Sequence, residues 1–539
     1  MKSVKSKKFK VMLSFILLIA FFTFTLLSVS SVSTSLAASS KSSKPVITWW
    51  TTLDAKVAVS YNNLAQVACY QYLMKKFNVK IEFIHPPSGS EREQFNLMLA
   101  SKKLPDIIEY NWLSDYPGGP SKAILDKVII PLNNYLPKYG QNLKKYLDSH
   151  PDIKKMVITD DGTVYCFPFI READVNRVGT GPYIRKDWLD KLHLQVPETV
   201  NEWTDMLRKF RDNATLLNGG KNPLYPFSIA FKFGTGLRTS WYGHFLAGAW
   251  GITLGMYVEN GKVKYGPLTS QFKEFIKVVQ TWWKENLIDP DILNMNQQAI
   301  QAKILNDQIG AYLGRVSGDT GRFLQAKKGT EFDIVAAPWP VLKKGQKPEI
   351  GAKEFAYPGY GSAAITTQCK NIPLAMKILD WGYSKEGYMV YNFGIEGKSY
   401  VMKNGKPTYT DEILNNPKLS ILEALSKYAR SGTSGPFVQS KDYVIQILPF
   451  PQQQDALKKF SVPSNSKLLP PVTLTVEESK KVANILNGIE TYYDEMFVRM
   501  ITGKFTNIDA FQKTLKRMGI DEVLKVYQDA YNRYLKRKI

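Results

Sequence analysis

The sequence predicts an α/β protein built on a parallel, doubly wound sheet, and its length predicts more than one domain. Short buried strands alternate with helical segments between residues 45 and 110, in the order β-α-β-α-β. This alternation is typical of parallel sheets. The chain has 539 residues, which is too long for a single hydrophobic core. We therefore expect two or more α/β domains.

The three strands of this opening unit are predicted from their apolar patterns. Residues 45–50 form a short apolar run, residues 79–84 largely alternate between apolar and polar, and residues 105–110 repeat the buried pattern. A helix is predicted between the first two strands. The segment Ser90-Glu91-Arg92-Glu93 matches a capping box, which predicts that another helix begins there and leads to the third strand.

Later parts of the chain repeat these signals. Capping boxes at residues 199–202 and 475–478 predict two further helix starts. Ser384 is expected to cap a helix that stops near Gly394. The remaining predicted elements are helices over 271–286 and 373–383, short strands over 308–313 and 332–337, and C-terminal helices that start near 509 and resume after Gly519.

The first 37 residues predict a secretory signal. Five lysines and no acid occupy residues 2–10, an uncharged apolar run covers 11–29, and Ser35-Leu36-Ala37 places small residues at a cleavage site. Residues 38–44 are predicted to be a tether. An uncleaved membrane anchor is the alternative, because the apolar run approaches the ~20 residues that span a bilayer.

Charge and cysteine content exclude several classes of function. The formal net charge is +23, and +18 remains without the five signal lysines, but the basic residues are scattered. This pattern indicates a solvated surface, and no fingerprint of a nucleic-acid-binding module is present. Cys69, Cys166 and Cys369 form no disulfide framework, and we expect three buried thiols.

No sequence motif for catalysis is present. The four histidines are far apart, and neither a nucleophile elbow nor a phosphate-binding loop occurs. Paired carboxylates of a glycoside hydrolase would meet only in space, so a secreted polysaccharide-active enzyme stays an open alternative.

Aromatic residues are abundant, with 11 Trp, 29 Tyr and 27 Phe. Aromatic rings can stack on the apolar faces of sugar rings, while Asp, Asn, Arg and Gln can bond the hydroxyl edges. Core packing is the alternative for each ring. The set as a whole favours carbohydrate binding.

Several segments resemble one known family. Residues 104–108 (LPDII), 181–192 (GPYIRKDWLDKL), 196–203 (VPETVNEW) and 391–400 (YNFGIEGKSY) are similar, in this order along the chain, to segments of the extracellular solute-binding proteins of carbohydrate-uptake ABC transporters. The similarity is to the large lipoprotein-type branch of Gram-positive, Paenibacillus-like bacteria. It extends over nearly all of residues 45–537.

The resemblance implies a two-lobed periplasmic-binding-protein-like fold of type II, with the ligand cleft between the lobes. We expect lobe one to comprise residues 45–170 with about 311–365, and lobe two to comprise 171–310 with about 366–539. The C-terminal helices are expected to pack across both lobes. Hinge closure around the ligand is the motion that the resemblance implies.

The implied function is that of an extracellular, non-catalytic receptor, monomeric and without a cofactor. It would bind an oligosaccharide and deliver it to the permease subunits of an ABC importer. A surface sugar sensor or adhesin without transport is a second alternative, beside the enzyme.

The sequence departs from the family pattern at two places. Relatives of this branch carry a lipid-bearing cysteine after the signal, where this chain has Ser35-Leu36-Ala37. We therefore expect membrane contact only through the permease or an uncleaved signal. Many relatives also have an acidic calcium loop, whereas residues 211–222 keep one carboxylate, Asp212, so no metal is predicted.

Ligand contacts are expected at the carboxyl ends of strands, where open α/β sheets place their sites. Arg315 follows a predicted strand and could bond hydroxyls or a uronate carboxylate. The predicted ligand-binding residues are Trp50, Asp54, Asn111, Trp112, Tyr116, Trp241, Trp250, Arg315, Trp339, Tyr357 and Tyr360.

Overall fold

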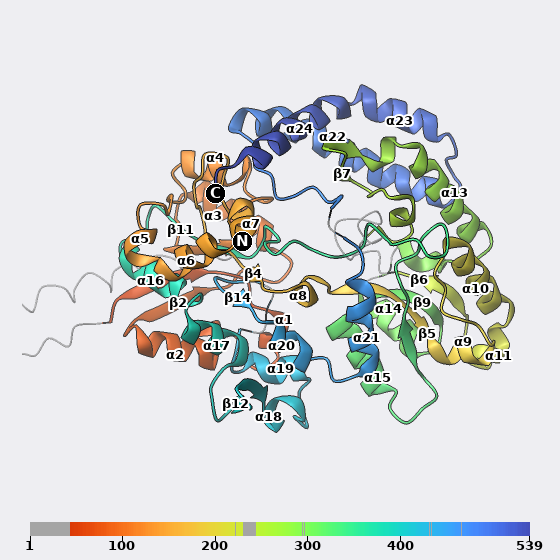
Figure 1. Ribbon diagram of the computed structural model, residues 1–539, viewed down its shortest axis with the longest axis horizontal. Helices are drawn as coiled ribbons and strands as arrows, with labels where there is room; N and C mark the ends of the chain where they lie inside the picture. The colour runs from red at the N-terminus through yellow and green to blue at the C-terminus, as the bar shows by residue number, and fades with distance from the viewer. Residues whose placement is uncertain are drawn as a thin grey trace, which may run out of the picture. The chain divides into compact units, whose positions relative to one another are not determined.

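Two mixed β-sheets organise the folded part of the chain (Figure 1). The computed structural model describes residues 44–220, 222–229, 244–293, 295, 297–430, 432, 434–464 and 466–539. The predicted signal, residues 1–37, lies outside the described residues, as does nearly all of the predicted tether. Pro45–Ile539 form one compact unit, and all structural statements below concern it.

The first sheet has the strand order β11-β3-β1-β2. Strands β1 (Val46–Trp50), β2 (Lys80–Ile84) and β3 (Ile107–Tyr110) run parallel, with Trp49 opposite both Phe83 and Ile107. These are the three strands predicted from the sequence, and the prediction is confirmed. Strand β11 (Ser362–Ile365) was not predicted, and it joins β3 antiparallel from a distant part of the chain.

Helices connect these parallel strands as predicted. The short helix η1 (Leu64–Gln66) and α2 (Ala68–Lys76) separate β1 from β2, and α3 (Glu91–Ser101) separates β2 from β3. The predicted capping box at Ser90 is wrong, because its side chain makes no cap bond. The Glu91 carboxylate instead accepts from the backbone N–H of Gly89 at 2.9 Å.

The other predicted caps are confirmed. The hydroxyl of Thr199 accepts from the backbone N–H of Glu202 at 3.2 Å, and α10 (Val200–Asp212) begins there. A second reciprocal box at Thr475 begins α22 (Val476–Ile501). Ser384 caps α17 (Lys385–Phe393) by accepting from Gly387 at 3.0 Å. Each of these side chains satisfies a backbone donor that the first helical turn leaves free.

The second sheet has the order β10-β5-β9-β6. Strand β5 (Thr180–Arg185) pairs antiparallel with both β9 (Ile309–Arg315) and β10 (Ile334–Ala336), while β6 (Tyr225–Ser228) pairs parallel with β9. We call the part of the chain around the first sheet lobe one and the part around the second sheet lobe two.

The observed division of the chain differs from the predicted boundaries in two places. Residues 311–336, which were assigned to lobe one, contain most of β9 and all of β10, and both strands belong to the second sheet. Helices α16 (Ile372–Trp381) and α17 were assigned to lobe two, yet their apolar residues belong to the core of lobe one. Strand pairing causes the first difference and helix packing the second, and short motifs encode neither kind of contact between distant segments.

The C-terminal helices complete the core of lobe two. Apolar side chains of α22, α23 (Ile508–Arg517) and α24 (Ile520–Lys536) share one cluster with those of α10 and α13 (Ser270–Lys284). The chain end also contacts the turn after α7 (Pro151–Val157) of lobe one, where Arg537 bonds Asp160.

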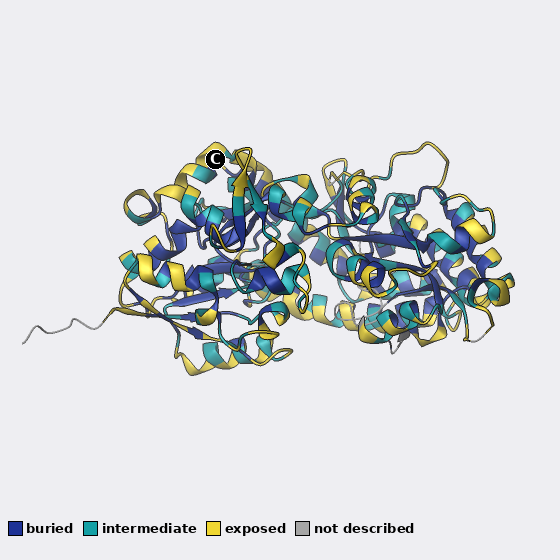
Figure 2. Cartoon of the chain, turned by 90° about the horizontal axis from the view of Figure 1, so that it is seen from below, coloured by how far each residue is buried: buried dark blue, intermediate teal, exposed yellow. Residues whose placement is uncertain are grey.

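The remaining elements are short, and Figure 2 shows that both sheets are buried beneath helices with exposed outer faces. They are α1 (Ala55–Ala58), α4 (Gly119–Leu125), α5 (Leu136–Tyr139), α6 (Gln141–Ser149), β4 (Ile170–Arg171), α8 (Asp174–Arg177), α9 (Lys186–Lys191), α11 (Ala214–Asn218), η3 (Ala247–Trp250), β7 (Met256–Glu259), β8 (Lys262–Tyr265), η4 (Gly266–Leu268), η5 (Pro290–Leu293), α14 (Gln297–Leu305), η6 (Val316–Thr320), α15 (Gly321–Ala326), β12 (Tyr400–Lys403), β13 (Lys406–Tyr409), α18 (Asp411–Leu414), α19 (Ile421–Ser426), β14 (Val438–Gln439), α20 (Lys441–Gln446) and α21 (Pro451–Phe460).

The three cysteines are buried free thiols, as predicted. Burial raises the pKa of Cys69 to about 12, so this thiol is protonated and unreactive at neutral pH. Within the described ranges, none of the helices combines the length and the apolar character that crossing a membrane requires.

Candidate ligand-binding site

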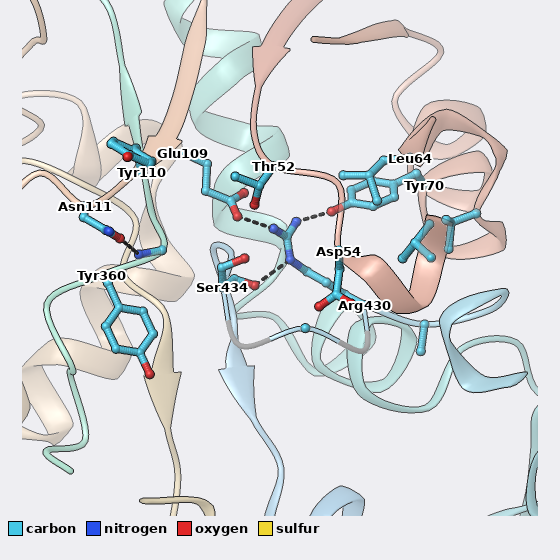
Figure 3. A pocket seen from close by; sticks show the side chains of 15 residues that line it. Thr52, Asp54, Leu64, Tyr70, Glu109, Tyr110, Asn111, Tyr360, Arg430 and Ser434 are labelled. Atoms are coloured by element: carbon cyan, nitrogen blue, oxygen red, sulfur yellow. Dashed lines mark hydrogen bonds and ion pairs between the residues drawn. The ribbon is translucent and has the colours of Figure 1, made fainter. Parts of the chain in front are cut away.

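A cavity of about 240 Å³ lies at the edge of the first sheet where β1 and β3 end (Figure 3). Its lining comes from residues 52–57, 64–70, 109–111 and 360–361, and from residues 429, 430, 432 and 434. Segments that are more than 300 residues apart in the sequence therefore share one small space.

Strand direction explains why these segments meet. Strands β1 and β3 are parallel neighbours, so their carboxyl ends lie at the same edge of the sheet. Strand β11 runs the opposite way and pairs Ser362 with Tyr110, so the residues before its start also reach this edge. The cavity occupies the position at which open α/β sheets commonly bind ligands.

A buried ion pair lies in the wall of the cavity. Nη2 of Arg430 lies 2.5 Å from Oε1 of Glu109, and the two side chains are 7% and 1% exposed. Arg430 also donates from Nη1 to the Tyr70 hydroxyl and from Nε to the backbone oxygen of Ser434 at 2.7 Å. Three different segments are thus fixed around one guanidinium.

The charge on Arg430 is stabilised in place. Burial alone would lower the pKa of its guanidinium, but Glu109, Tyr70 and Tyr391 together outweigh that effect, and the pKa is raised. Since a pKa above the ordinary value keeps the proton, Arg430 is positively charged at every physiological pH.

The second carboxylate oxygen of Glu109 lies outside the ion pair. This atom, Oε2, is buried and has no hydrogen-bond partner among the residues that the structure describes. Leaving a buried acceptor unpaired costs roughly 1–3 kcal/mol, and more for a charged group. A hydroxyl donor from a bound ligand would remove this cost.

Three of the predicted site residues line the cavity: Asp54, Asn111 and Tyr360. Asp54 caps α1 by accepting from the backbone N–H of Lys56 at 2.8 Å. Asn111 accepts from the N–H of Gly361 at 3.1 Å, which holds the two ends of the lining together. The Tyr360 hydroxyl accepts a bond from Arg171 at 2.6 Å, which orients its ring.

The predicted aromatic residues of the first sheet lie in its core instead. Trp50, Trp112 and Tyr116 are only 4%, 1% and 7% exposed and surround Phe95. Tyr116 also donates from its hydroxyl to Asp126 at 2.8 Å. Core packing, the alternative considered for each ring, describes these three positions.

Two more predicted rings are core residues. Tyr357 is fully buried and shares a hydrogen bond with the Tyr165 hydroxyl at 2.5 Å. Trp339 is 2% exposed and packs against Phe460, with ring centroids 6.2 Å apart.

Two of the contacts predicted in lobe two, Trp250 and Arg315, do not line this cavity. Trp250 is partly buried and packs against Phe275. Arg315 is exposed at the end of β9, and its backbone N–H donates to Asp319 at 3.1 Å. Trp241 lies outside the described residues. A binding role for these residues stays a prediction.

Several lining residues were not predicted. Glu109 and Tyr110 end β3, so the strand-end rule that selected Asn111 could have selected them as well. Arg430 is different, because it lies in a turn 321 residues from Glu109 and no local motif marks it. Its only sequence signal is the glycine-rich segment around it, residues 430–435.

The predicted loss of the calcium site stays a prediction. Asp212 accepts from Nε of the adjacent Arg211 at 2.7 Å, and this hydrogen bond holds the pKa of the Asp212 carboxyl below its usual value. In the described ranges, no group of three or more histidine, cysteine and carboxylate side chains has the geometry to hold a metal ion.

The comparison with known families assigns the chain. The family described as bacterial extracellular solute-binding protein matches residues 61–389. The chain belongs to this family. The similarity also extends beyond the matched region: the fructooligosaccharide ABC transporter substrate-binding protein FusA of Streptococcus pneumoniae serotype 4 is 27% identical over 489 residues, which cover 87% of both chains.

Solved structures share the fold of this family member. The S. pneumoniae FusA complex with kestose superposes with a TM-score of 0.72 at 24% identity, covering 92% of this chain and all of the other. The alginate-binding protein AlgQ2 without calcium ion gives 0.70 at 24% identity, covering 91% and 98%. The predicted two-lobed fold of type II is therefore confirmed.

Proposed function

We propose that this chain is the extracellular receptor of an ABC importer, which binds an oligosaccharide between its lobes and delivers it to a membrane permease. The observation that carries the proposal is the cavity at the edge of the first sheet, where hydrogen-bonding side chains and tyrosine rings converge. The position of the cavity and the chain's membership of a solute-binding family both support a role in ligand binding.

The lining offers the contacts that a sugar needs. Asp54, Asn111 and Glu109 present planar polar groups, while Tyr110 and Tyr360 present rings. A hydrogen bond to a charged group contributes about 1.5–3 kcal/mol. Micromolar affinity corresponds to about 8 kcal/mol, so a handful of such bonds is sufficient.

The size of the cavity indicates that it holds only part of an oligosaccharide. Pockets that enclose drug-sized ligands measure roughly 300–1,000 Å³, compared with about 240 Å³ here. The remaining sugar units would contact lobe two, where Trp241, Trp250 and Arg315 stay predicted contacts. Closure of the lobes would bury these units.

The remaining parts of the proposal concern location and partners. The receptor is exported by residues 1–37, acts as a monomer, contacts the membrane through the permease or an uncleaved signal, and catalyses no reaction. A secreted polysaccharide-active enzyme would release product steadily from oligosaccharides, and such release would contradict the proposal. A surface sensor or adhesin would bind sugar without restoring uptake in cells that express the permease.

A thermal-shift screen over fructo-, xylo-, cello- and galacturonate oligosaccharides tests ligand binding directly, since a ligand that binds only the folded state raises the melting temperature. We expect at least one oligosaccharide to stabilise the protein. The variant Asn111→Ala should lower the affinity for that ligand at least tenfold, because the substitution removes a polar group from the cavity lining. The matched control Asn415→Ala changes an exposed asparagine at the end of α18, outside the cavity, and this variant should bind the ligand normally.

A further inference from the structure

The charged groups at the cavity are paired with one another. Two carboxylates, Asp54 and Glu109, line it together with one guanidinium, that of Arg430. Arg430 pairs with Glu109, and Lys56, just outside the lining, pairs with Asp54 at 3.0 Å, so the described lining offers no additional cation to an anionic ligand. This local balance contrasts with the whole chain, whose formal net charge is +23.

The guanidinium is 7% exposed and bonded to the protein, which disfavours its use by a ligand carboxylate. Each of its three nitrogens donates to the protein, at Ser434, Tyr70 and Glu109. Turning it toward a ligand would leave Glu109 buried without its partner, which is strongly destabilising. A Cβ atom at Gly435 would overlap the guanidinium, so the turn before β14 also fits closely against it.

The two carboxylates favour hydroxyl donors. Oε2 of Glu109 is a buried acceptor without a partner among the described residues. Asp54 is about one-third exposed and faces the same space, and Lys56 pairs with it at 3.0 Å. Ionised carboxylates accept hydrogen bonds but repel a second carboxylate.

The positive surface does not reverse this local preference. Exposed charges are screened beyond about 8 Å at physiological ionic strength. The scattered lysines therefore attract anions in general, but recognition depends on the groups that touch the ligand.

We propose that the sugar unit held in this cavity is uncharged, so that the receptor takes a neutral oligosaccharide and rejects uronates. The inference rests on the proposed function and specifies its substrate class. Among the relatives, one is named for neutral fructooligosaccharides and another for alginate, a uronate polymer. The lining described above favours a neutral sugar over a uronate.

The test compares matched ligands by isothermal titration calorimetry on the full mature chain. The panel contains neutral fructo-, xylo- and cello-oligosaccharides, and galacturonate trimers beside their methyl esters. We expect a neutral oligosaccharide to bind at least 100-fold more tightly than any uronate, with an affinity that is unchanged between 0.05 and 0.5 M NaCl, since no ionic contact is screened.

The outcomes separate the two proposals. Tight uronate binding that weakens with salt would overturn the neutral-ligand inference and leave the receptor function standing. Binding of no oligosaccharide of either class would overturn the receptor function and this inference with it.

A variant tests the mechanism of rejection. Asp54→Asn keeps a residue that caps helices well but removes one negative charge from the lining. We expect this variant to reduce at least fivefold the ratio between the affinity for the methyl-esterified trimer and the affinity for the unesterified galacturonate trimer. The control Asp205→Asn, at an exposed aspartate of lobe two, should leave the difference unchanged. An unchanged difference in Asp54→Asn would overturn the role of this carboxylate.

Discussion

Arg430 forms a buried ion pair with Glu109, 321 residues away along the chain, at the carboxyl end of β3. The pair joins the turn before β14 to the first sheet and forms part of the wall of the candidate site (Figure 3). The same two side chains therefore stabilise the fold and line the proposed binding site.

Substituting one partner of this pair should lower the unfolding free energy of the protein. Arg430→Met leaves Glu109 charged and buried without its partner, which costs about 3–5 kcal/mol of unfolding free energy. Urea denaturation measures this loss. Lys80→Ala, in an exposed pair with Glu82, is the control and should change stability by less than about 1 kcal/mol.

The double variant Arg430→Met/Glu109→Leu separates stability from binding. Replacing both charges with apolar groups removes the unpaired charge, so much of the lost stability should return. Ligand binding should nevertheless be lost, because Glu109→Leu removes the carboxylate that accepts a ligand hydroxyl. Normal ligand affinity in the double variant would contradict the placement of the site.

The sequence was sufficient to predict the parts of the fold that local patterns encode. The parallel strands β1, β2 and β3 and the capped starts of α10, α17 and α22 follow from apolar spacing and side-chain caps, which operate within a few residues. Ser90 failed as a cap because its neighbour Glu91 bonds the preceding backbone instead.

Features that depend on distant pairing were not predictable in this way. Strand β11 joins β3 from more than 250 residues away, and its pairing determines that Tyr360 and Gly361 reach the cavity. The same limit applies to Arg430. For aromatic residues such as Trp112, the strand-end rule could not distinguish a ring facing ligand from a ring packed against Phe95.

Gly435 should tolerate no side chain. Its φ of 119° lies in the region that favours glycine, and an added Cβ would overlap the Arg430 guanidinium. Gly435→Ala should therefore cost about 2 kcal/mol or more by combining backbone strain with overpacking, and it should weaken ligand binding. Thermal unfolding and titration calorimetry measure the two effects.

Gly179 provides the matched control. Its φ is not positive, and an added Cβ would meet no atom within 4 Å. Gly179→Ala should change stability by less than about 1 kcal/mol. Equal effects of the two substitutions would show that Gly435 has no special fit against Arg430.

Stability should depend on pH through Glu259. Hydrogen bonds from Lys264 and Lys467 lower the pKa of this carboxyl in the folded protein below its usual 4.5. Because the folded pKa is the lower one, the stabilisation is present above pH 4.5 and is lost as the pH falls through the folded value. Glu259→Gln should cost about 0.5–1 kcal/mol at pH 7, and the difference from wild type should shrink toward pH 3.

Urea denaturation at several pH values checks this prediction. Glu274→Gln, in an exposed pair with Lys277, is the control and should show no comparable pH dependence. A Glu259→Gln effect that grows as the pH falls would contradict the sign.

Arg537 should contribute more to stability than its place near the chain end suggests. Its side chain is 1% exposed, and Nη2 lies 2.7 Å from Oδ1 of Asp160 and 2.6 Å from the Thr473 hydroxyl. The contact joins the end of α24, whose apolar side chains belong to the core of lobe two, to a turn of lobe one.

Arg537→Ala should cost about 1–3 kcal/mol of unfolding free energy, since Asp160 keeps a second partner in Arg533. Lys538→Ala, at the exposed neighbour, should change stability by less than about 0.5 kcal/mol, and equal denaturation midpoints for the two variants would rule out a structural role for the Arg537 contact.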